Sequence, residues 1–321
     1  MQAIFAVTFP FFALVVCGYF AARQRVLPEA AIPGLNLFVL YFALPCLLFR
    51  FGASTPLAEL LNPAVLAVYA LAGLLIVAFT IAVTLSPRVH LKDAAFGALV
   101  AAFPNLGFMG VPMLIALLGP AATGPLSAAI LFDIVVTSSL CVGLAQAHDA
   151  AGRGRGATIS NALRGTAQNP LPWAIVFGAL ASYLGFALPG PIDQVVRMLG
   201  DAATPVALFS IGSVLWRAGQ HAHTRTPVAL YLPVALIKLV AHPLLVFTLG
   251  TAATALGAPL SPFNLTVLVL AAALPSASNV SLMAERYEAD NGRVARIILA
   301  STVMAFLSFS LLASLLGAGR S

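Results

Sequence analysis

The stretch FPNLGFMGVP, residues 103–112, interrupts a hydrophobic segment that runs from Asp93 to Leu118. Its two prolines and two glycines favour a break in the helix, because proline removes a backbone donor and glycine weakens a helix. Inside a bilayer no water satisfies the freed backbone groups, so a broken helix is stable only where it faces protein or a water-filled cavity. The stretch therefore predicts a broken transmembrane helix that faces the interior of the molecule.

A second stretch of this kind, LPSASN at residues 274–279, lies in the other half of the chain. Interrupted helices at corresponding positions of two halves are typical of the binding site of a secondary transporter. We therefore expect the two stretches to form one site.

The composition places the chain among membrane proteins. Of its 321 residues 61% are hydrophobic and 8% are charged, and the mean hydropathy is +1.01. These values lie outside the range of soluble domains and indicate a polytopic membrane protein. The basic residues are sparse and lie between apolar runs, so nucleic-acid binding is not expected. Cys17, Cys46 and Cys141 lack metal-ligand spacing, and no metal or other cofactor is expected.

A transmembrane helix needs about 20 mostly apolar residues, and this rule divides the chain into ten spans. The predicted spans are approximately residues 2–22, 34–52, 64–85, 93–118, 124–147, 169–188, 195–216, 227–252, 263–285 and 293–316. Twelve of the 16 Lys and Arg residues lie in the loops after odd-numbered spans, and three lie on the opposite side. By the positive-inside rule, both termini are expected outside the cytoplasm. The membrane is expected to be the inner (cell) membrane of a bacterial-type cell.

The ten spans divide into two halves. Residues 1–148 form the first five-helix repeat, residues 149–168 a cytoplasmic connector, and residues 169–321 the second repeat. Because five is odd, the second repeat enters the membrane with inverted orientation. Prolines also match: Pro45 and Pro205 lie in the second span of each half. The alternative is that these prolines merely kink unrelated helices. The expected fold is all-α, with two inverted five-helix repeats and with helices 4 and 9 broken.

Breaking a helix exposes N–H groups at the start of one half-helix, which attract anions, and carbonyl groups at the end of the other, which attract cations. The expected cradle is polar and uncharged and suits a carboxylate. Its candidate residues are Pro104, Asn105, Gly107, Gly110, Pro275, Ser276, Ser278 and Asn279. The alternative is that these residues only satisfy each other where the helices meet.

Two ionisable residues lie at membrane depth, Asp133 in the fifth span and Lys238 in the eighth. Lys238 could bind the negative charge of the substrate, and Asp133 could carry a proton. Alternatively the two pair with each other. His242, one turn beyond Lys238, is expected to be a packed histidine, and residues 285–293 are interpreted as a solvated loop.

FPNLGFMGVP, together with YFALP at 41–45 and AST at 300–302, resembles the auxin efflux carrier family, especially its short bacterial members described as malonate or malate permeases. The resemblance implies a fold shared in outline with the bile-acid sodium symporters, in which helices 4 and 9 cross at their breaks. It implies a scaffold domain of helices 1, 2, 6 and 7, and a transport domain of helices 3, 4, 5, 8, 9 and 10. By position it also implies a substrate site at Pro104, Asn105, Pro275 and Asn279.

Two features differ from the plant auxin carriers. Their halves are joined by a long hydrophilic loop, whereas the connector here has about 20 residues. They also share an acidic residue on the third helix, whereas residues 64–85 here contain no acid. Neither auxin as the substrate nor that proton site is therefore implied.

The leading hypothesis is a secondary transporter that moves a small organic anion, a mono- or dicarboxylate, by alternating access, with sodium or a proton as candidate coupling ion. The alternative is a passive anion channel or a uniporter without ion coupling. No Ser/His dyad, paired Asp motif or metal-binding His spacing appears on facing spans, so an enzyme is not expected. The expected partners are the organic anion, the lipid bilayer and a second copy of the chain in a homodimer.

Overall fold

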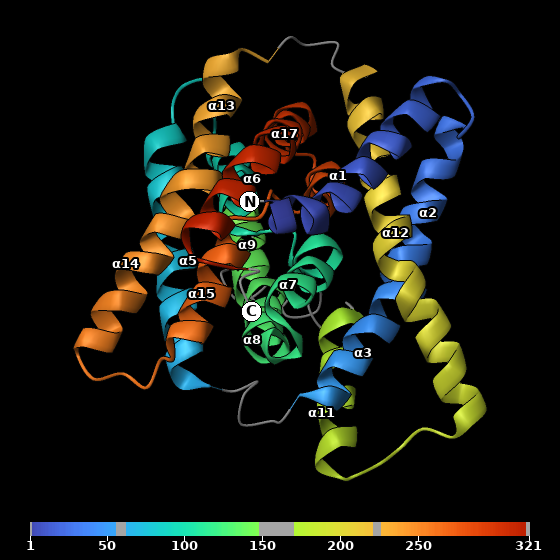
Figure 1. The fold of residues 1–321 in the computed structure, drawn as a ribbon. Coiled ribbons are helices and arrows are strands. Elements are labelled where there is room, and N and C mark those ends of the chain that lie inside the picture. The colour runs from blue at the N-terminus through green and yellow to red at the C-terminus, as the bar shows by residue number, and fades with distance from the viewer. Residues whose placement is uncertain (1, 56–61, 148–169, 221–225, 319–321) are drawn as a thin grey trace.

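The structure, a computed structural model, describes residues 2–55, 62–147, 170–220 and 226–318. These residues form helices throughout, with no β-strand in the described ranges (Figure 1). The predicted connector at 149–168 falls outside them.

In the first half, several helices are extended by π-helical turns, which carry the symbol η. The elements are α1 (Gln2–Arg23), α2 (Ile32–Phe38), η2 (Val39–Ala43), α3 (Leu44–Ser54), α5 (Pro63–Thr84), α6 (Leu91–Ala102), η3 (Leu106–Gly110), α7 (Val111–Leu118), α8 (Thr123–Phe132), η5 (Asp133–Thr137) and α9 (Ser138–Ala147). Short 3₁₀ turns at Glu29–Ala31 and Pro120–Ala122 precede α2 and α8.

The second half has the same character. Its elements are α11 (Pro170–Tyr183), α12 (Gly190–Gln220), α13 (Val228–Leu236), η6 (Ile237–Ala241), α14 (His242–Ala255), α15 (Pro262–Ala272), α16 (Asn279–Arg286) and α17 (Asn291–Leu315).

Seven helical stretches in the described ranges are long and apolar enough to cross a membrane. They are Ala6–Arg23, Glu29–Ser54, Pro63–Thr84, Pro120–Gln146, Gly190–Arg217, Val228–Ala255 and Asn291–Leu315. Three shorter apolar helices accompany them, at Leu106–Leu118, Pro170–Tyr183 and Pro262–Ala272. The chain is therefore an all-helical, multi-pass membrane protein.

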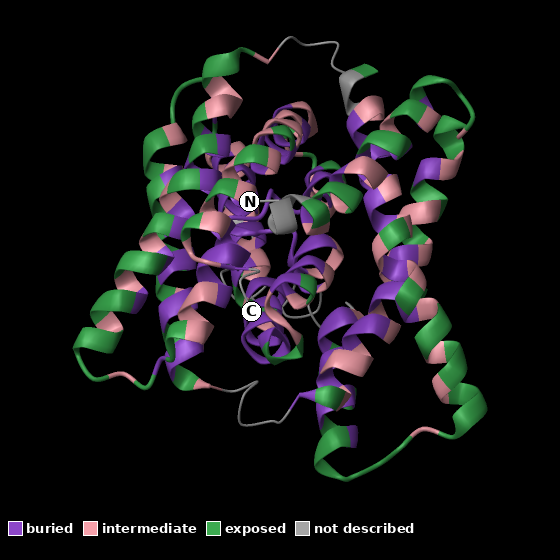
Figure 2. Ribbon diagram, in the orientation of Figure 1, coloured by how far each residue is buried: buried purple, intermediate pink, exposed green. Residues whose placement is uncertain are grey.

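Large apolar side chains on the outer surface fit this conclusion. Leu71 and Phe79 of α5 are about half exposed, and so is Leu244 of α14. Figure 2 shows exposed residues along the outer faces of the helices and buried residues in the middle of the molecule. Such a surface is unfavourable in water but matches lipid tails.

Two helix pairs pack with their backbones in direct approach, α1 with α12 and α3 with α11 (Figure 1). A Cβ added to Gly18 would overlap the backbone of Phe209, and one added to Gly212 would overlap the backbone of Val15. Gly52 and Gly178 stand in the same relation between α3 and α11. Small residues allow this close packing where lipid provides no hydrophobic drive between helices. We call α1, α2, η2, α3, α11 and α12 the glycine-packed group.

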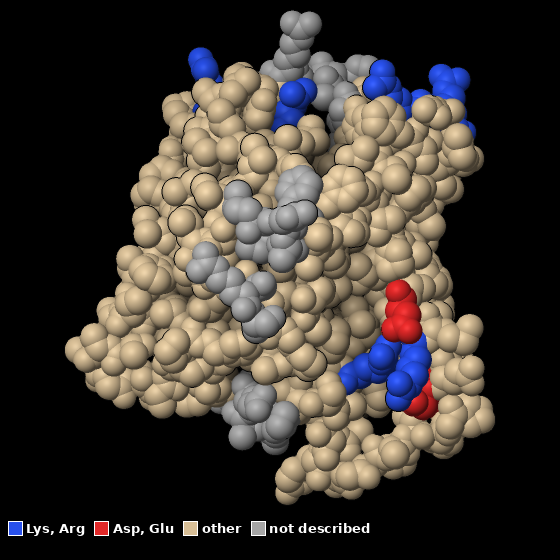
Figure 3. Space-filling view, viewed as in Figure 1, with Lys and Arg blue, Asp and Glu red and all other residues tan. Residues whose placement is uncertain are grey.

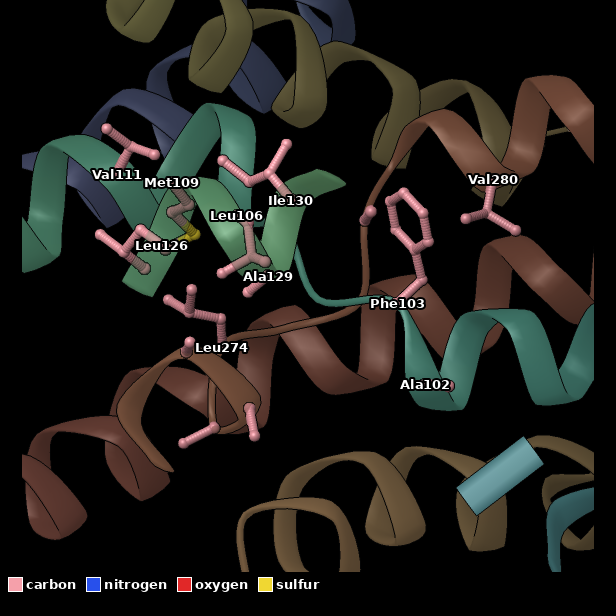
Figure 4. Packing of buried hydrophobic residues seen from close by; sticks show 14 of the residues in the cluster. Ala102, Phe103, Leu106, Met109, Val111, Leu126, Ala129, Ile130, Leu274 and Val280 are labelled. Atoms are coloured by element: carbon pink, nitrogen blue, oxygen red, sulfur yellow. The ribbon is translucent and has the colours of Figure 1, made fainter. Parts of the chain in front are cut away.

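Both predicted breaks are present, and they meet. The chain leaves helical geometry between α6 and η3, and again between α15 and α16. The N–H of Asn105 donates to the Pro275 carbonyl at 2.8 Å, and the N–H of Ala277 donates to the Phe103 carbonyl at 3.0 Å. Figure 4 shows the two extended segments passing beside Phe103. We call residues 103–105 and 273–278 the crossing, where each segment satisfies part of the other's freed backbone.

The interpretation of residues 285–293 as a solvated loop is wrong for Arg293, which is only 2% exposed. Its Nε donates to the Leu230 carbonyl and its Nη1 to the Asp93 carbonyl, both at 2.8 Å. The guanidinium therefore joins α6, α13 and α17, because its planar fork can reach two carbonyls at once.

Candidate functional site

A cavity of about 80 Å³ lies at the crossing. The broken helices contribute Pro104, Asn105, Gly107 and Asn279 to its lining, and η5 contributes Asp133. On the side of the glycine-packed group, apolar side chains close it, namely Leu40, Leu44, Leu48 and Leu171. The cavity thus lies between the glycine-packed group and the helices that carry the breaks.

The amides of Asn105 and Asn279 are the free polar side chains of this cavity. Asn105 is 4% exposed, and Asn279 is half-buried. Neither amide forms a hydrogen bond with any described residue, although both line the cavity. Because a buried polar group without a partner is costly, these two amides are available to a bound solute.

Backbone N–H groups at the starts of two half-helices are also free. Those of Gly107 and Phe108, at the start of the helix after the first break, donate to no described carbonyl or side chain, and the same holds for Ser278 and Asn279. Three of these residues, Gly107, Phe108 and Asn279, line the cavity. The first turn of a helix carries partial positive charge, so two such turns at one cavity favour an anion.

Asp133 is buried and holds its position through two donors. The Tyr69 hydroxyl donates to Oδ2 at 2.7 Å, and the Thr137 hydroxyl donates to Oδ1 at 3.0 Å. Tyr69 lies in α5, the predicted third span, and the sequence interpretation missed it. The available signal was a single tyrosine in a mostly apolar span, since a buried phenol usually has a partner.

Lys238 does not line the cavity and does not pair with Asp133. Its Nζ donates to the Ala272 carbonyl at 2.6 Å and lies 3.3 Å from Nδ1 of His242. Neither Asp133 nor Lys238 forms an ion pair with a described residue. Of the two alternatives left open for these residues, direct pairing is therefore wrong, although each lies within the other's electrostatic field.

The remaining predicted site residues stabilise the crossing without lining the cavity. Gly110 faces the Leu274 side chain, and the Pro275 carbonyl accepts the Asn105 N–H. The N–H of Ser276 donates to Oγ of Ser301 in α17 at 3.2 Å, while Ser278 is buried beside them. Of the eight cradle residues, these four belong to the wall behind the cavity.

Possible metal ligands do not cluster in the described part of the chain, where no three His, Cys, Asp or Glu side chains come together.

Comparison with known proteins identifies the family of the chain. The model of a family described as membrane transport protein matches residues 3–147 and 156–313. The chain belongs to this family. The resemblance to the auxin efflux carriers is thereby confirmed, and the chain is a membrane transporter.

Several relatives of this family align along nearly the whole chain. A protein of Rhizobium meliloti (strain 1021) named "Putative malonate transporter" is 28% identical over 321 residues, which cover 99% of this chain and 98% of that protein. The "Uncharacterized transporter YfdV" of Escherichia coli (strain K12) is 26% identical, over 93% of this chain and 92% of its own length. An "Uncharacterized transporter" of Methanothermobacter thermautotrophicus is also 26% identical, over 93% of both chains.

Proposed function

We propose that this transporter moves a small organic anion, a mono- or dicarboxylate, across the cell membrane by alternating access. The observation that carries the proposal is the cavity in which two unpartnered amides and free N–H groups of two half-helices converge. At roughly 10–15 Å³ for each water, about 80 Å³ holds on the order of six water molecules, which suits a small carboxylate. The name of the Rhizobium relative supports malonate as the first solute to test.

The proposed architecture has ten spans in two inverted repeats, in which the three shorter apolar helices complete the seven longer ones. The glycine pairs support it. An inverted repeat exchanges the first span with the sixth and the second with the seventh, so it converts the contact of α1 with α12 into that of α11 with α3. Both contacts depend on one glycine from each helix. The reciprocal hydrogen bonds at the crossing follow the same exchange.

The position of the cavity supports alternating access. Its apolar wall belongs to the glycine-packed group, which corresponds to the predicted scaffold, and its polar wall belongs to the broken helices. A movement of the broken helices against the glycine-packed group would carry the polar wall, with its solute, past the fixed apolar wall. A homodimer through the scaffold stays a prediction.

The distribution of charge supports the proposed orientation. Figure 3 shows Lys and Arg side chains gathered at the end of the molecule where α12 ends and α13 begins, and a mixed acidic and basic group toward the other end. Two ion pairs, Arg50–Asp201 and Arg197–Asp193, join acidic and basic side chains of α3 and α12. The positive-inside rule then assigns the first end to the cytoplasm.

We further propose that a proton is the coupling ion and that Asp133 carries it. An organic anion and an ionised Asp133 would repel each other in one cavity of low polarity, so the anion binds best when Asp133 is protonated. The hydroxyls of Tyr69 and Thr137 keep the carboxyl at the cavity wall during this exchange.

The decisive experiment is counterflow of radiolabelled malonate in proteoliposomes. Asn105→Ala and Asn279→Ala are each expected to reduce the rate by roughly 10-fold or more, because each removes a hydrogen bond to a charged group. Asn264→Ala, at the start of α15 and away from the cavity, is the matched control. Full rates in both folded variants would contradict the site. Ion currents without saturable counterflow would instead indicate a channel.

A further inference from the structure

The eighth span places two polar side chains against the crossing. Lys238 lies in η6 and His242 begins α14, one turn further along the chain, and both are fully buried. Neither lines the cavity that the proposed function uses. They therefore need an explanation of their own, because a buried charge is costly unless something compensates it.

Lys238 meets the carbonyl end of a half-helix. Its Nζ lies 2.6 Å from the carbonyl oxygen of Ala272, the last residue of α15 before the break. The next N–H groups, of Ala273 and Leu274, bond to the carbonyls of Val269 and Ala271 and leave that of Ala272 to the lysine. The C-terminal end of a helix carries partial negative charge, so the ammonium lies where a cation is favoured.

His242 extends this arrangement by one turn along the eighth span. Its Nδ1 faces Nζ of Lys238 at 3.3 Å, and its ring centroid lies 6.2 Å from that of Tyr69. Nε2 forms no hydrogen bond of standard geometry with a described residue. The two side chains, one turn apart, thus form one buried polar pair at the carbonyl end of α15.

The charges around Lys238 complete the picture. Asp133 is the acid that acts on it electrostatically, from beyond ion-pair distance. Tyr69 is near both groups of side chains, because its hydroxyl donates to Asp133 at 2.7 Å and its ring centroid is 6.2 Å from that of His242. The positive charge of Lys238 is therefore held by a helix end and a carbonyl, with Asp133 as the distant counter-charge.

We propose that Lys238 is a built-in cation, which occupies the place where a sodium ion would otherwise bind at the end of α15, and that this transporter works without sodium. In secondary transporters the carbonyl ends of broken helices hold the coupling sodium ion or proton. An ammonium supplies the same charge at the same oxygen and repels a second cation. The part of this proposal that concerns transport rests on the proposed function; the occupied cation position does not.

Thermal unfolding of the purified full-length chain tests the occupied position without any substrate. Each sample is measured in sodium chloride and in choline chloride at equal concentration. The wild-type protein is expected to melt at the same temperature in both salts. Lys238→Ala and Lys238→Gln remove the charge, and sodium is expected to raise their melting temperatures by at least about 2 °C, because a ligand of the folded state stabilises it. Arg197→Ala, an exposed cation in the ion pair with Asp193, should show no difference between the salts.

A wild-type melting temperature that rises with sodium would overturn the proposal, and so would equal melting of both Lys238 variants in the two salts. Recovery of a folded variant only in the presence of sodium would support it. Malonate counterflow by the wild-type protein gives the second reading, and equal rates in sodium and choline media are expected. Sodium-dependent rates would overturn the inference, whereas counterflow absent from both media would contradict the proposed function and leave the thermal result valid.

Discussion

The glycine-packed group and the crossing are stabilised in opposite ways. At Gly18 and Gly178 the contact depends on the absence of a side chain, because a single carbon would overlap a neighbouring backbone. At the crossing the contact depends on hydrogen bonds. The N–H groups of Asn105 and Ala277 each donate to a carbonyl of the other segment. The difference teaches that added volume should damage the first region, whereas a removed hydrogen-bond partner should damage the second.

The physical reason lies in what lipid can offer. Lipid tails are as apolar as the side chains they surround, so helices associate through close van der Waals contact, and small residues allow it. A broken helix cannot be stable that way, since its freed N–H and carbonyl groups need partners inside the protein. The glycine-packed group and the crossing are therefore expected to respond to different substitutions.

Volume added to the glycine-packed group should give the largest loss of stability. Gly18→Ala forces a methyl group into the Phe209 backbone, which cannot rotate away as a side chain would. We expect a loss near the upper end of the roughly 1–3 kcal/mol known for overpacked sites, seen as a lower melting temperature or lost folded yield. Gly143→Ala in α9 is the control, because a Cβ there meets nothing within 4 Å. Equal stability of the two variants would contradict the claim that the glycine-packed group is sensitive to added volume.

The two regions also differ in how far their features could be predicted. The breaks were predictable because FPNLGFMGVP and LPSASN combine proline, glycine and polar residues within apolar segments. Asn105 and Asn279 followed from the same stretches, and both line the cavity. By contrast, glycine is common in transmembrane helices, and no sequence pattern shows that Gly18 meets a backbone almost 200 residues away.

The hydrogen-bond partners of the buried polar residues also could not be predicted from the sequence. The sequence placed Asp133 and Lys238 at membrane depth but could not identify their partners, Tyr69 and the Ala272 carbonyl. Arg293 was missed because it follows a run of charged residues that is typical of solvated loops. Partner identity depends on tertiary packing, and local spacing carries no information about it beyond the neighbouring turns of one helix.

Removal of Arg293 should give the next largest effect and test whether polar contacts stabilise the helices outside the glycine-packed group. Arg293→Leu keeps bulk but leaves the carbonyl of Leu230 without its donor. We expect a loss of about 2 kcal/mol, since an unsatisfied buried acceptor costs roughly 1–3 kcal/mol, measured by thermal unfolding in detergent. Arg293→Lys keeps the charge without the planar fork and should restore only part of the stability. Unchanged stability in both variants would mean that apolar packing stabilises this region too.

Substitutions beside Asp133 should change transport more than stability. Tyr69→Phe removes one donor from the carboxylate, and we expect malonate uptake to fall roughly 10-fold, as for other hydrogen bonds to charged groups.

If Asp133 carries the proton, an acidic outside should accelerate wild-type uptake, because proton and anion enter together. Asp133→Asn should abolish that acceleration. Uptake is measured with and without an imposed pH gradient.

Tyr183→Phe is the control for these measurements, because Tyr183 is 75% exposed at the end of α11. Acceleration by acid that survives in a folded Asp133→Asn protein would contradict the assignment of the proton to this carboxyl group.

The ion pair between Arg50 and Asp201 should give the smallest effect, and it tests the comparison from the other side. It joins α3 to α12 within the glycine-packed group with an Nη1–Oδ1 distance of 2.7 Å, yet the side chain of Asp201 is 72% exposed. Water and salt screen such pairs, so a double-mutant cycle with Arg50→Ala and Asp201→Ala should give a coupling of about 0.2–1 kcal/mol that decreases as ionic strength rises. A coupling above about 2 kcal/mol, independent of salt, would show that polar contacts also stabilise the glycine-packed group. The division between a region sensitive to volume and a region sensitive to hydrogen bonding would then no longer hold.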